Sequence, residues 1–177
     1  HFCSLNSIHL TNSWEQRKVE DLFKITRGYV LAATKTTENP ESKNVYPVFS
    51  SQTANNGLLG YFDKFLYENA ITWTTDGANA GTVNFRHGKF YCTNVCGVLI
   101  SDKQKANTMF SYALGKVTKR NVSYVGNPKL MNNVMAKIEV KYPCNSLEQE
   151  KISKLFESID SLITLHQRKF FNCYMNF

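Results

Sequence analysis

The sequence PCNSLEQEKI at residues 143–152 predicts the start of a long helix and divides the chain into a body and an arm. Pro143 disfavours continuation of the preceding segment into this helix, because proline removes a backbone donor and restricts the residue before it. Ser146 and Gln149 have the three-residue spacing of a capping box, in which two side chains satisfy free backbone N–H groups. We therefore expect a helix from Ser146 to about Lys169, roughly 36 Å long.

Apolar residues recur along this predicted helix at intervals of three and four. That spacing forms one narrow helix face, which is typical of a helix that pairs with another helix. The alternative is that the face only packs on the chain's own body. We expect a coiled-coil pair or small bundle, formed by Ile152, Leu155, Phe156, Ile159, Leu162 and Ile163.

The length of 177 residues is typical of one domain with an appendage, and 42% hydrophobic residues suffice to build its core. No apolar stretch is long enough for a transmembrane helix, and the N-terminus lacks the pattern of a signal peptide. The five cysteines are odd in number and scattered, which favours reduced thiols. We expect a cytoplasmic protein in which residues 1–13 are a linker or a remnant of something upstream.

The net charge of +7 lies in the body rather than in the arm. From Ser146 onward, four basic residues balance four acidic ones, whereas the interval between Asp102 and Glu139 is basic and contains no acidic residue. One basic region on a folded domain favours a polyanionic partner, most often nucleic acid. The alternative is a solvated basic face without a partner. The candidates for phosphate contact are Lys116, Lys119, Arg120 and Lys129.

The body alternates short apolar segments with turn signals, which is typical of a β-rich fold. We predict an α+β fold: a mixed twisted sheet or partial barrel at residues 14–145, followed by a dimerisation or spacer helix and tail at 146–177. Asn56-Gly57 and His87-Gly88 are the predicted turns. An amphipathic element is expected at 14–25 and a helix at 108–116. Strands are expected at 46–50, 58–62, 70–75, 82–85, 90–100 and 134–142.

Polar loops of the body contain side chains that can read DNA bases. Asn and Gln pair with the adenine edge through two hydrogen bonds, and small residues, as in the loop at 74–81, permit close approach. An ordinary polar turn is the competing interpretation of residues 50–56. Our candidates for base readout are Gln52, Asn55, Asn56, Asn79, Arg86 and His87.

No set of residues with the spacing of a catalytic or metal site emerges from the sequence. His87, Cys92 and Cys96 offer three zinc ligands but no fourth, and the cysteines are better interpreted as core residues. Glu139 has no nearby upstream acidic residue with which to share a nuclease metal. The loop at 74–81 lacks the Gly-Lys-Ser/Thr ending of a nucleotide-binding loop. We therefore expect a binding module rather than an enzyme, with no bound metal.

Several motifs of the chain resemble those of the specificity (S) subunit of type I restriction–modification enzymes. The resemblance extends over roughly residues 14–169 and matches one half of such a subunit, with one target recognition domain and one helical region. The matching stretches are WEQRK (14–18), YPVFSS (46–51), GY (60–61), ITWTTDG (71–77), KFYCTNV (89–95), Pro143, LEQ (147–149), KI (151–152) and ITLHQRK (163–169).

The resemblance implies a DNA-reading subunit without an active site of its own. Modification subunits would bind S-adenosylmethionine and methylate adenine, and restriction subunits would use ATP and Mg²⁺. The alternative is a scaffold or regulatory subunit with little DNA specificity. The uncharged stretch FFNCYMNF (170–177) departs from the family helix and suggests a truncated arm. With one recognition domain, the chain is expected either to form a homodimer through the arm or to be a weakly binding fragment.

Overall fold

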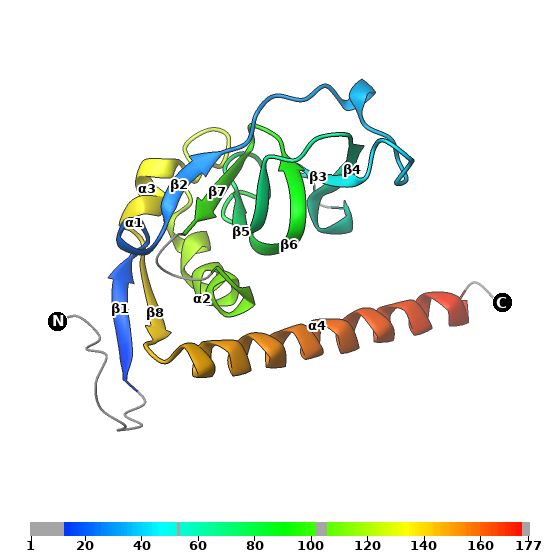
Figure 1. The fold of residues 1–177 in the computed structure, drawn as a ribbon. Coiled ribbons are helices and arrows are strands. Elements are labelled where there is room, and N and C mark those ends of the chain that lie inside the picture. Colours follow the sequence, from blue (N-terminus) through cyan, green and yellow to red (C-terminus); the bar gives the residue numbers. More distant parts are fainter. Residues whose placement is uncertain (1–12, 53, 102–105, 175–177) are drawn as a thin grey trace.

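A computed structural model describes residues 13–52, 54–101 and 106–174. Residues 1–12, and with them most of the expected linker at 1–13, lie outside the described residues. Figure 1 shows a body of sheets and short helices, with the long helix α4 passing beneath α2 and extending along the body. In the described residues, no helix is both long and apolar enough to cross a membrane.

The main sheet of the body is mixed and has six strands in the order β2-β7-β5-β6-β3-β4. Its pairings are antiparallel except for the parallel contact between β3 and β6, and the described strands do not close into a barrel. The strands are β2 (Lys24–Arg27), β3 (Tyr46–Phe49), β4 (Leu58–Phe62), β5 (Tyr67–Thr74), β6 (Val83–Cys92) and β7 (Cys96–Ile100).

A second, two-stranded sheet joins the start of the body to its end. In it, β1 (Trp14–Lys18) pairs antiparallel with β8 (Glu139–Pro143), so the arm leaves the body beside the first strand. The expected single element at 14–25 is therefore β1, a short helix and the start of β2. The helices are α1 (Val19–Leu22), α2 (Thr108–Thr118), α3 (Asn132–Lys137) and α4 (Ser146–Tyr174), with 3-10 turns η1 (Ala33–Lys35), η2 (Ala54–Gly57) and η3 (Lys119–Asn121).

Trp73 on β5 occupies the centre of the larger hydrophobic core. Its side chain is 1% exposed, and its indole Nε1 donates a hydrogen bond to the carbonyl of Leu130 at 3.0 Å. The ring lies so close to Gly97 on β7 that a Cβ there would approach a ring carbon to 2.1 Å. Phe110 of α2 packs in the same core, so β5, β7 and α2 are held together by one cluster.

The predicted strand at 134–142 is wrong in its first half. Residues Asn132–Lys137 form α3, and the N–H groups of Val134 and Met135 both donate to the carbonyl of Met131. The apparent alternation misleads because Val134 is exposed and Met135 is the buried residue of this turn. Only the segment from Glu139 onward is a strand.

The predicted turn at His87-Gly88 is also wrong, because β6 continues through it. Gly88 has a positive φ of 65°, and its N–H donates to Asn69 Oδ1 at 2.8 Å where the β5–β6 register shifts. The glycine therefore marks an irregularity within paired strands. A turn lies instead at Thr93, whose carbonyl accepts from Cys96 N–H, so the predicted strand at 90–100 is divided between β6 and β7.

Asn145, rather than Ser146, caps the arm helix. Asn145 Oδ1 accepts a hydrogen bond from Leu147 N–H at 2.9 Å, and its carbonyl accepts from Gln149 N–H at 3.1 Å. Gln149 Nε2 donates to the carbonyl of Pro143 at 2.8 Å. The expected capping box is therefore replaced by an asparagine cap, a residue type equally suited to that position.

We expect Asn145→Ala to lower the free energy of unfolding by about 1 kcal/mol, because the N–H of Leu147 loses its acceptor. Ser146→Ala is the matched control and should change it by no more than a few tenths, since alanine is a good helix former. Urea unfolding followed by circular dichroism measures both. A larger loss of unfolding free energy for Ser146→Ala than for Asn145→Ala would favour the capping box and contradict the observed asparagine cap.

Candidate nucleic-acid interface

Three consecutive residues of η2 have left-handed backbone conformations, and we call Asn55, Asn56 and Gly57 the asparagine turn. Their φ angles are 49°, 53° and 84°. Such conformations cost about 1–3 kcal/mol each in non-glycine residues and persist only where the surroundings impose them. Asparagine tolerates them better than most residues. At Gly57 a Cβ would lie 2.7 Å from the carbonyl oxygen of Ser50, which excludes a side chain.

Backbone and side-chain hydrogen bonds hold the asparagine turn and the residues that precede it. Ser50 N–H donates to the carbonyl of Gly57 at 2.8 Å. Arg86 Nη2 donates to the carbonyl of Asn56 at 2.8 Å, and Asn79 Nδ2 donates to the carbonyl of Ser51 at 3.0 Å. Asn55 and Asn56 are exposed at the surface. The turn thus presents two amide side chains from a constrained backbone.

Gln52 and Asn79, two of the predicted readout residues, contribute to this framework. Gln52 Nε2 donates to the carbonyl of Leu58, next to the asparagine turn. Asn79 uses its amide nitrogen on Ser51. The structure therefore brings Gln52, Asn55, Asn56 and Asn79 together, although they come from two separate loops.

Arg86, also predicted to read bases, is buried beneath the turn. Its side chain lies on β6 with Nε donating to Thr72 Oγ1 at 3.1 Å. The guanidinium carbon lies 3.7 Å from the centroid of the Phe49 ring. Burial lowers the pKa of Arg86 to about 10, so the group is still charged at neutral pH.

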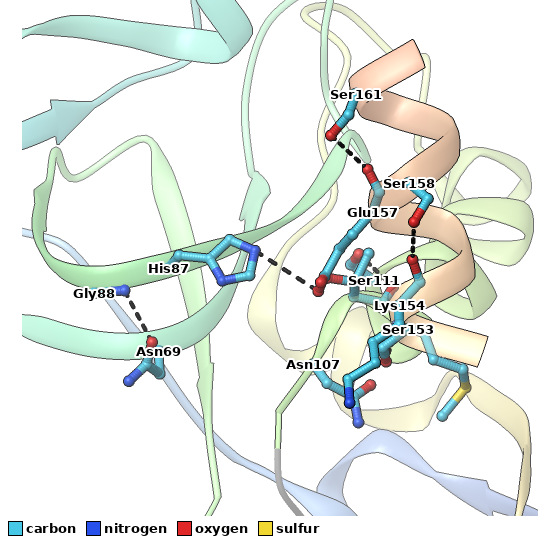
Figure 2. A network of polar contacts seen from close by, with 12 residues as sticks. Asn69, His87, Gly88, Asn107, Ser111, Ser153, Lys154, Glu157, Ser158 and Ser161 are labelled. Atoms are coloured by element: carbon cyan, nitrogen blue, oxygen red, sulfur yellow. Dashed lines mark hydrogen bonds and ion pairs between the residues drawn. The ribbon is translucent and has the colours of Figure 1, made fainter. Parts of the chain in front are cut away.

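His87 follows Arg86 on the strand but faces the arm. Its Nε2 lies 3.9 Å from Oε1 of Glu157 on α4 (Figure 2). Thr108 Oγ1 donates to the same carboxylate oxygen at 2.6 Å. Successive residues of a strand point to opposite sides. His87 therefore lies on the side of the arm and Arg86 on the side of the asparagine turn, although the two residues are adjacent in sequence.

The loop at residues 76–81 connects the asparagine turn to the basic region. Lys119 Nζ donates to the carbonyl of Ala80 at 3.0 Å and to Thr82 Oγ1 at 2.8 Å. Gly77 N–H donates to the carbonyl of Pro128, and Asp76 forms a backbone bridge with Lys129. Three segments distant in sequence, near 55, 79 and 127, thus form one continuous surface.

The four predicted phosphate contacts are all exposed. Lys116 and Lys119 line a groove of about 890 Å³ between β6, α2 and α4, whose arm side contributes Glu157 and Asp160. Arg120 follows in η3, and Lys129 lies beside Asp76. Lys119 differs from the others because its ammonium group already supports the 76–81 loop. The cations therefore border the same surface as the asparagine turn.

The predicted pairing residues of the arm divide into two sets. Ile152 packs against the core of the body, and the Phe156 ring stacks on Tyr112 of α2 with centroids 4.2 Å apart. Tyr112 also donates to Asp160, and this bond is the main cause that raises its pKa to about 12. Leu155, Ile159, Leu162 and Ile163 are exposed instead. The arm therefore docks on its own body along one side and leaves other apolar residues uncovered.

Cys92 and Cys96 are core residues, as the sequence predicts. Cys92 and Cys96 are buried, and burial raises the pKa of the Cys96 thiol to about 11, so it is protonated at neutral pH. Across the part of the chain that the structure describes, no cluster of three or more His, Cys, Asp or Glu residues could hold a metal ion.

Sequence reasoning missed the residues that support the asparagine turn and the arm. Thr72 and Phe49 hold Arg86, and Tyr112 holds the arm, but none of them lies in a motif that signals such a role. The available signal was the run Asn55-Asn56-Gly57, whose residue types favour left-handed conformations. That run predicts the turn but not its partners.

Comparison with known proteins reveals one family. Residues 11–170 match the family model described as type I restriction modification DNA specificity domain. In Mycoplasma pneumoniae, the protein named as the N-terminus of a candidate type I specificity subunit, S.MpnORF289P, is 38% identical over 80% of this chain and 75% of its own length. The type I restriction enzyme MpnII specificity subunit of the same organism is 34% identical over 84% of this chain and 44% of its own length.

Solved structures share the fold. A type I restriction-modification S subunit from M. genitalium aligns over 88% of this chain with a TM-score of 0.69 and 20% identity. The HsdS subunit of Thermoanaerobacter tengcongensis aligns over 94% with a TM-score of 0.60 and 11% identity. The chain spans 41% and 42% of these two proteins, respectively.

Proposed function

The chain belongs to the type I restriction modification DNA specificity family, and on that premise we propose that it is a sequence-recognition subunit, or one recognition half of it, in a type I restriction–modification system. The relatives are named as specificity subunits, and the family description refers to DNA specificity. The alternative role as a scaffold without DNA specificity has no support in these comparisons.

The observation that carries the proposal is the continuous surface formed by the asparagine turn, the 76–81 loop and the exposed cations. Amide side chains on a fixed backbone can recognise base edges, while surrounding lysine and arginine residues contact phosphates. Phosphate contacts orient the protein on the duplex, and base contacts select the sequence. The surface combines both kinds of group.

We further propose that catalysis belongs to partner subunits. Modification subunits would bind S-adenosylmethionine and restriction subunits would use ATP and Mg²⁺, while this chain would hold no cofactor. The arm would pair with a second helix, either in another copy of this chain or in a second recognition half. Its uncovered residues Leu155, Ile159 and Leu162 support that part of the proposal.

The proposal is tested by selecting bound fragments from a random-sequence duplex library, with and without the modification subunit. We expect enrichment of a short motif, repeated in inverted orientation at a fixed spacing if the chain pairs with itself. Salt-sensitive binding without any enriched motif, even with the modification subunit present, would overturn sequence recognition. Metal-dependent cleavage by the purified chain would contradict the absence of catalysis.

Neutralising one exposed cation should weaken binding to every DNA sequence equally. For Lys116→Gln, Arg120→Gln or Lys129→Gln, we expect the slope of log affinity against log salt to fall by about one, because one fewer phosphate is neutralised. Lys18→Gln in the two-stranded sheet is the matched control and should leave the slope unchanged. Fluorescence anisotropy of labelled DNA at several salt concentrations measures this slope. Equal effects of all four substitutions would mean that no local phosphate-binding surface exists.

A further inference from the structure

We infer that Arg86 is a positioning residue for DNA readout, which holds the asparagine turn so that Asn55 and Asn56 face the DNA. The inference rests on the proposed function and deepens it, because it names the residue that fixes the position of the base-reading side chains. Arg86 would act through the turn, whereas a direct base contact requires its guanidinium to reach the surface. Its side chain is instead 9% exposed.

The guanidinium joins three separate elements. Nε donates to Thr72 on β5, Nη2 donates to the carbonyl of Asn56 in the turn, and the guanidinium carbon lies over the Phe49 ring on β3. Arginine is suited to this role because its donors diverge from one rigid planar group. Lysine has a single nitrogen on a flexible stem and cannot reproduce the same pair of bonds with the same geometry.

The contacts of Arg86 are directed at neutral groups. Among the ion pairs of the described residues, none joins Arg86 to a carboxylate. A buried charge without an opposite charge contributes little to stability, because its desolvation is costly. A contribution to global stability therefore does not explain this residue, whereas its bond to a strained turn does.

Polar contacts hold the turn: beside the Arg86 bond, the Ser50 N–H donates to the carbonyl of Gly57. A cavity of about 120 Å³ separates the turn from the sheet, lined by polar side chains that include Thr74, Asn84 and Arg86 itself. Two successive asparagines with positive φ require imposed restraint. The Arg86 bond to the carbonyl of Asn56 acts at the second of them.

Removal of the guanidinium should leave the body folded. Thr72 Oγ1 retains a contact of 3.5 Å with the carbonyl of Asn84, and the carbonyl of Asn56 belongs to an exposed residue that water can reach. Arg86→Met keeps a long unbranched apolar side chain at this position, and Arg86→Lys keeps the charge. Thermal unfolding of both variants checks that the body is intact.

The first test is amide hydrogen exchange in the absence of DNA. We expect the Ser50 amide, which bonds to the carbonyl of Gly57, to exchange about tenfold faster in Arg86→Met and in Arg86→Lys than in the unmodified chain. Amides of β5 should be unaffected. If Arg86 only contacted bases, its substitution would leave the exchange rate of the Ser50 amide in the free protein unchanged. An unchanged rate would overturn the inference whether or not the chain recognises DNA.

The second test is a double-mutant cycle with DNA. Asn55→Gly/Asn56→Gly removes the reading side chains while retaining a backbone that tolerates positive φ. We expect Arg86→Met alone to abolish about tenfold discrimination at the bases read by the turn, with no change in the slope of log affinity against log salt. The variant that combines Arg86→Met with Asn55→Gly/Asn56→Gly should discriminate no less than Arg86→Met alone. Additive losses would identify a direct base contact and reject positioning. Absence of an enriched motif for the unmodified chain would instead reject the proposed function, leaving the exchange result to decide the inference.

Discussion

Trp73→Ala should destabilise the body by about 3–5 kcal/mol, the largest effect that we expect from one substitution in the core. The indole is almost fully enclosed, so its loss leaves a cavity between β5, β7 and α2. It also leaves the carbonyl of Leu130 without its donor, because Nε1 is 3.0 Å from that oxygen. Gly97 cannot fill the space, since it has no side chain.

Thermal unfolding should show this loss as a fall in midpoint of about 10–20 °C. Trp14→Ala is the matched control, because Trp14 lies on β1 with 45% of its surface exposed, and it should shift the midpoint by only a few degrees. Trp73→Phe should fall between the two, since it retains a ring but not the donor. Similar midpoints for Trp73→Ala and Trp14→Ala would show that the Trp73 cluster is not the core of the body.

Local signals in the sequence predicted those elements whose conformation is set by adjacent residues. The strand at 58–62 is confirmed as β4, and the turn at Asn56-Gly57 is confirmed because both residue types favour left-handed conformations. At Gly88 the same reasoning failed, since a glycine with positive φ serves equally well in a strand irregularity. Glycine reports a backbone conformation and does not say whether the chain reverses there.

The arrangement of the candidate interface depends on contacts between distant residues, which one sequence does not reveal. Asn56 and Arg86 are brought together because β3 pairs parallel with β6, and neither residue carries a sign of that pairing. The residue types were sufficient to select polar candidates for DNA contact. They were insufficient to distinguish exposed Asn55 from buried Arg86, because burial depends on which strands lie side by side.

The arm shows the same division between pattern and environment. Its three-and-four spacing predicts one apolar face, but the residues of that face lie in two different environments. Ile152 and Phe156 pack on the body, whereas Leu155 and Leu162 are 59% and 62% exposed. An exposed row of this kind on a docked helix indicates a second partner. We propose that this partner is another helix of the same type.

Leu162→Glu should therefore weaken self-association of the chain by about 10²–10⁴-fold. Burial of one leucine side chain contributes about 1.5–3 kcal/mol, and a two-fold symmetric contact buries it in both copies. Sedimentation equilibrium measures the change in dissociation constant. Ser161→Glu places the same charge on the neighbouring, groove-facing position and should leave pairing nearly unchanged.

The consequence for DNA recognition follows from symmetry. If pairing through Leu162 sets the distance between two recognition domains, Leu162→Glu should remove the fixed spacing between inverted motifs while each single motif is still preferred. Library selection with the variant separates these two properties. A chain that is monomeric at tens of micromolar, with Leu162→Glu and Ser161→Glu alike in every assay, would show that the uncovered row does not pair two copies of this helix.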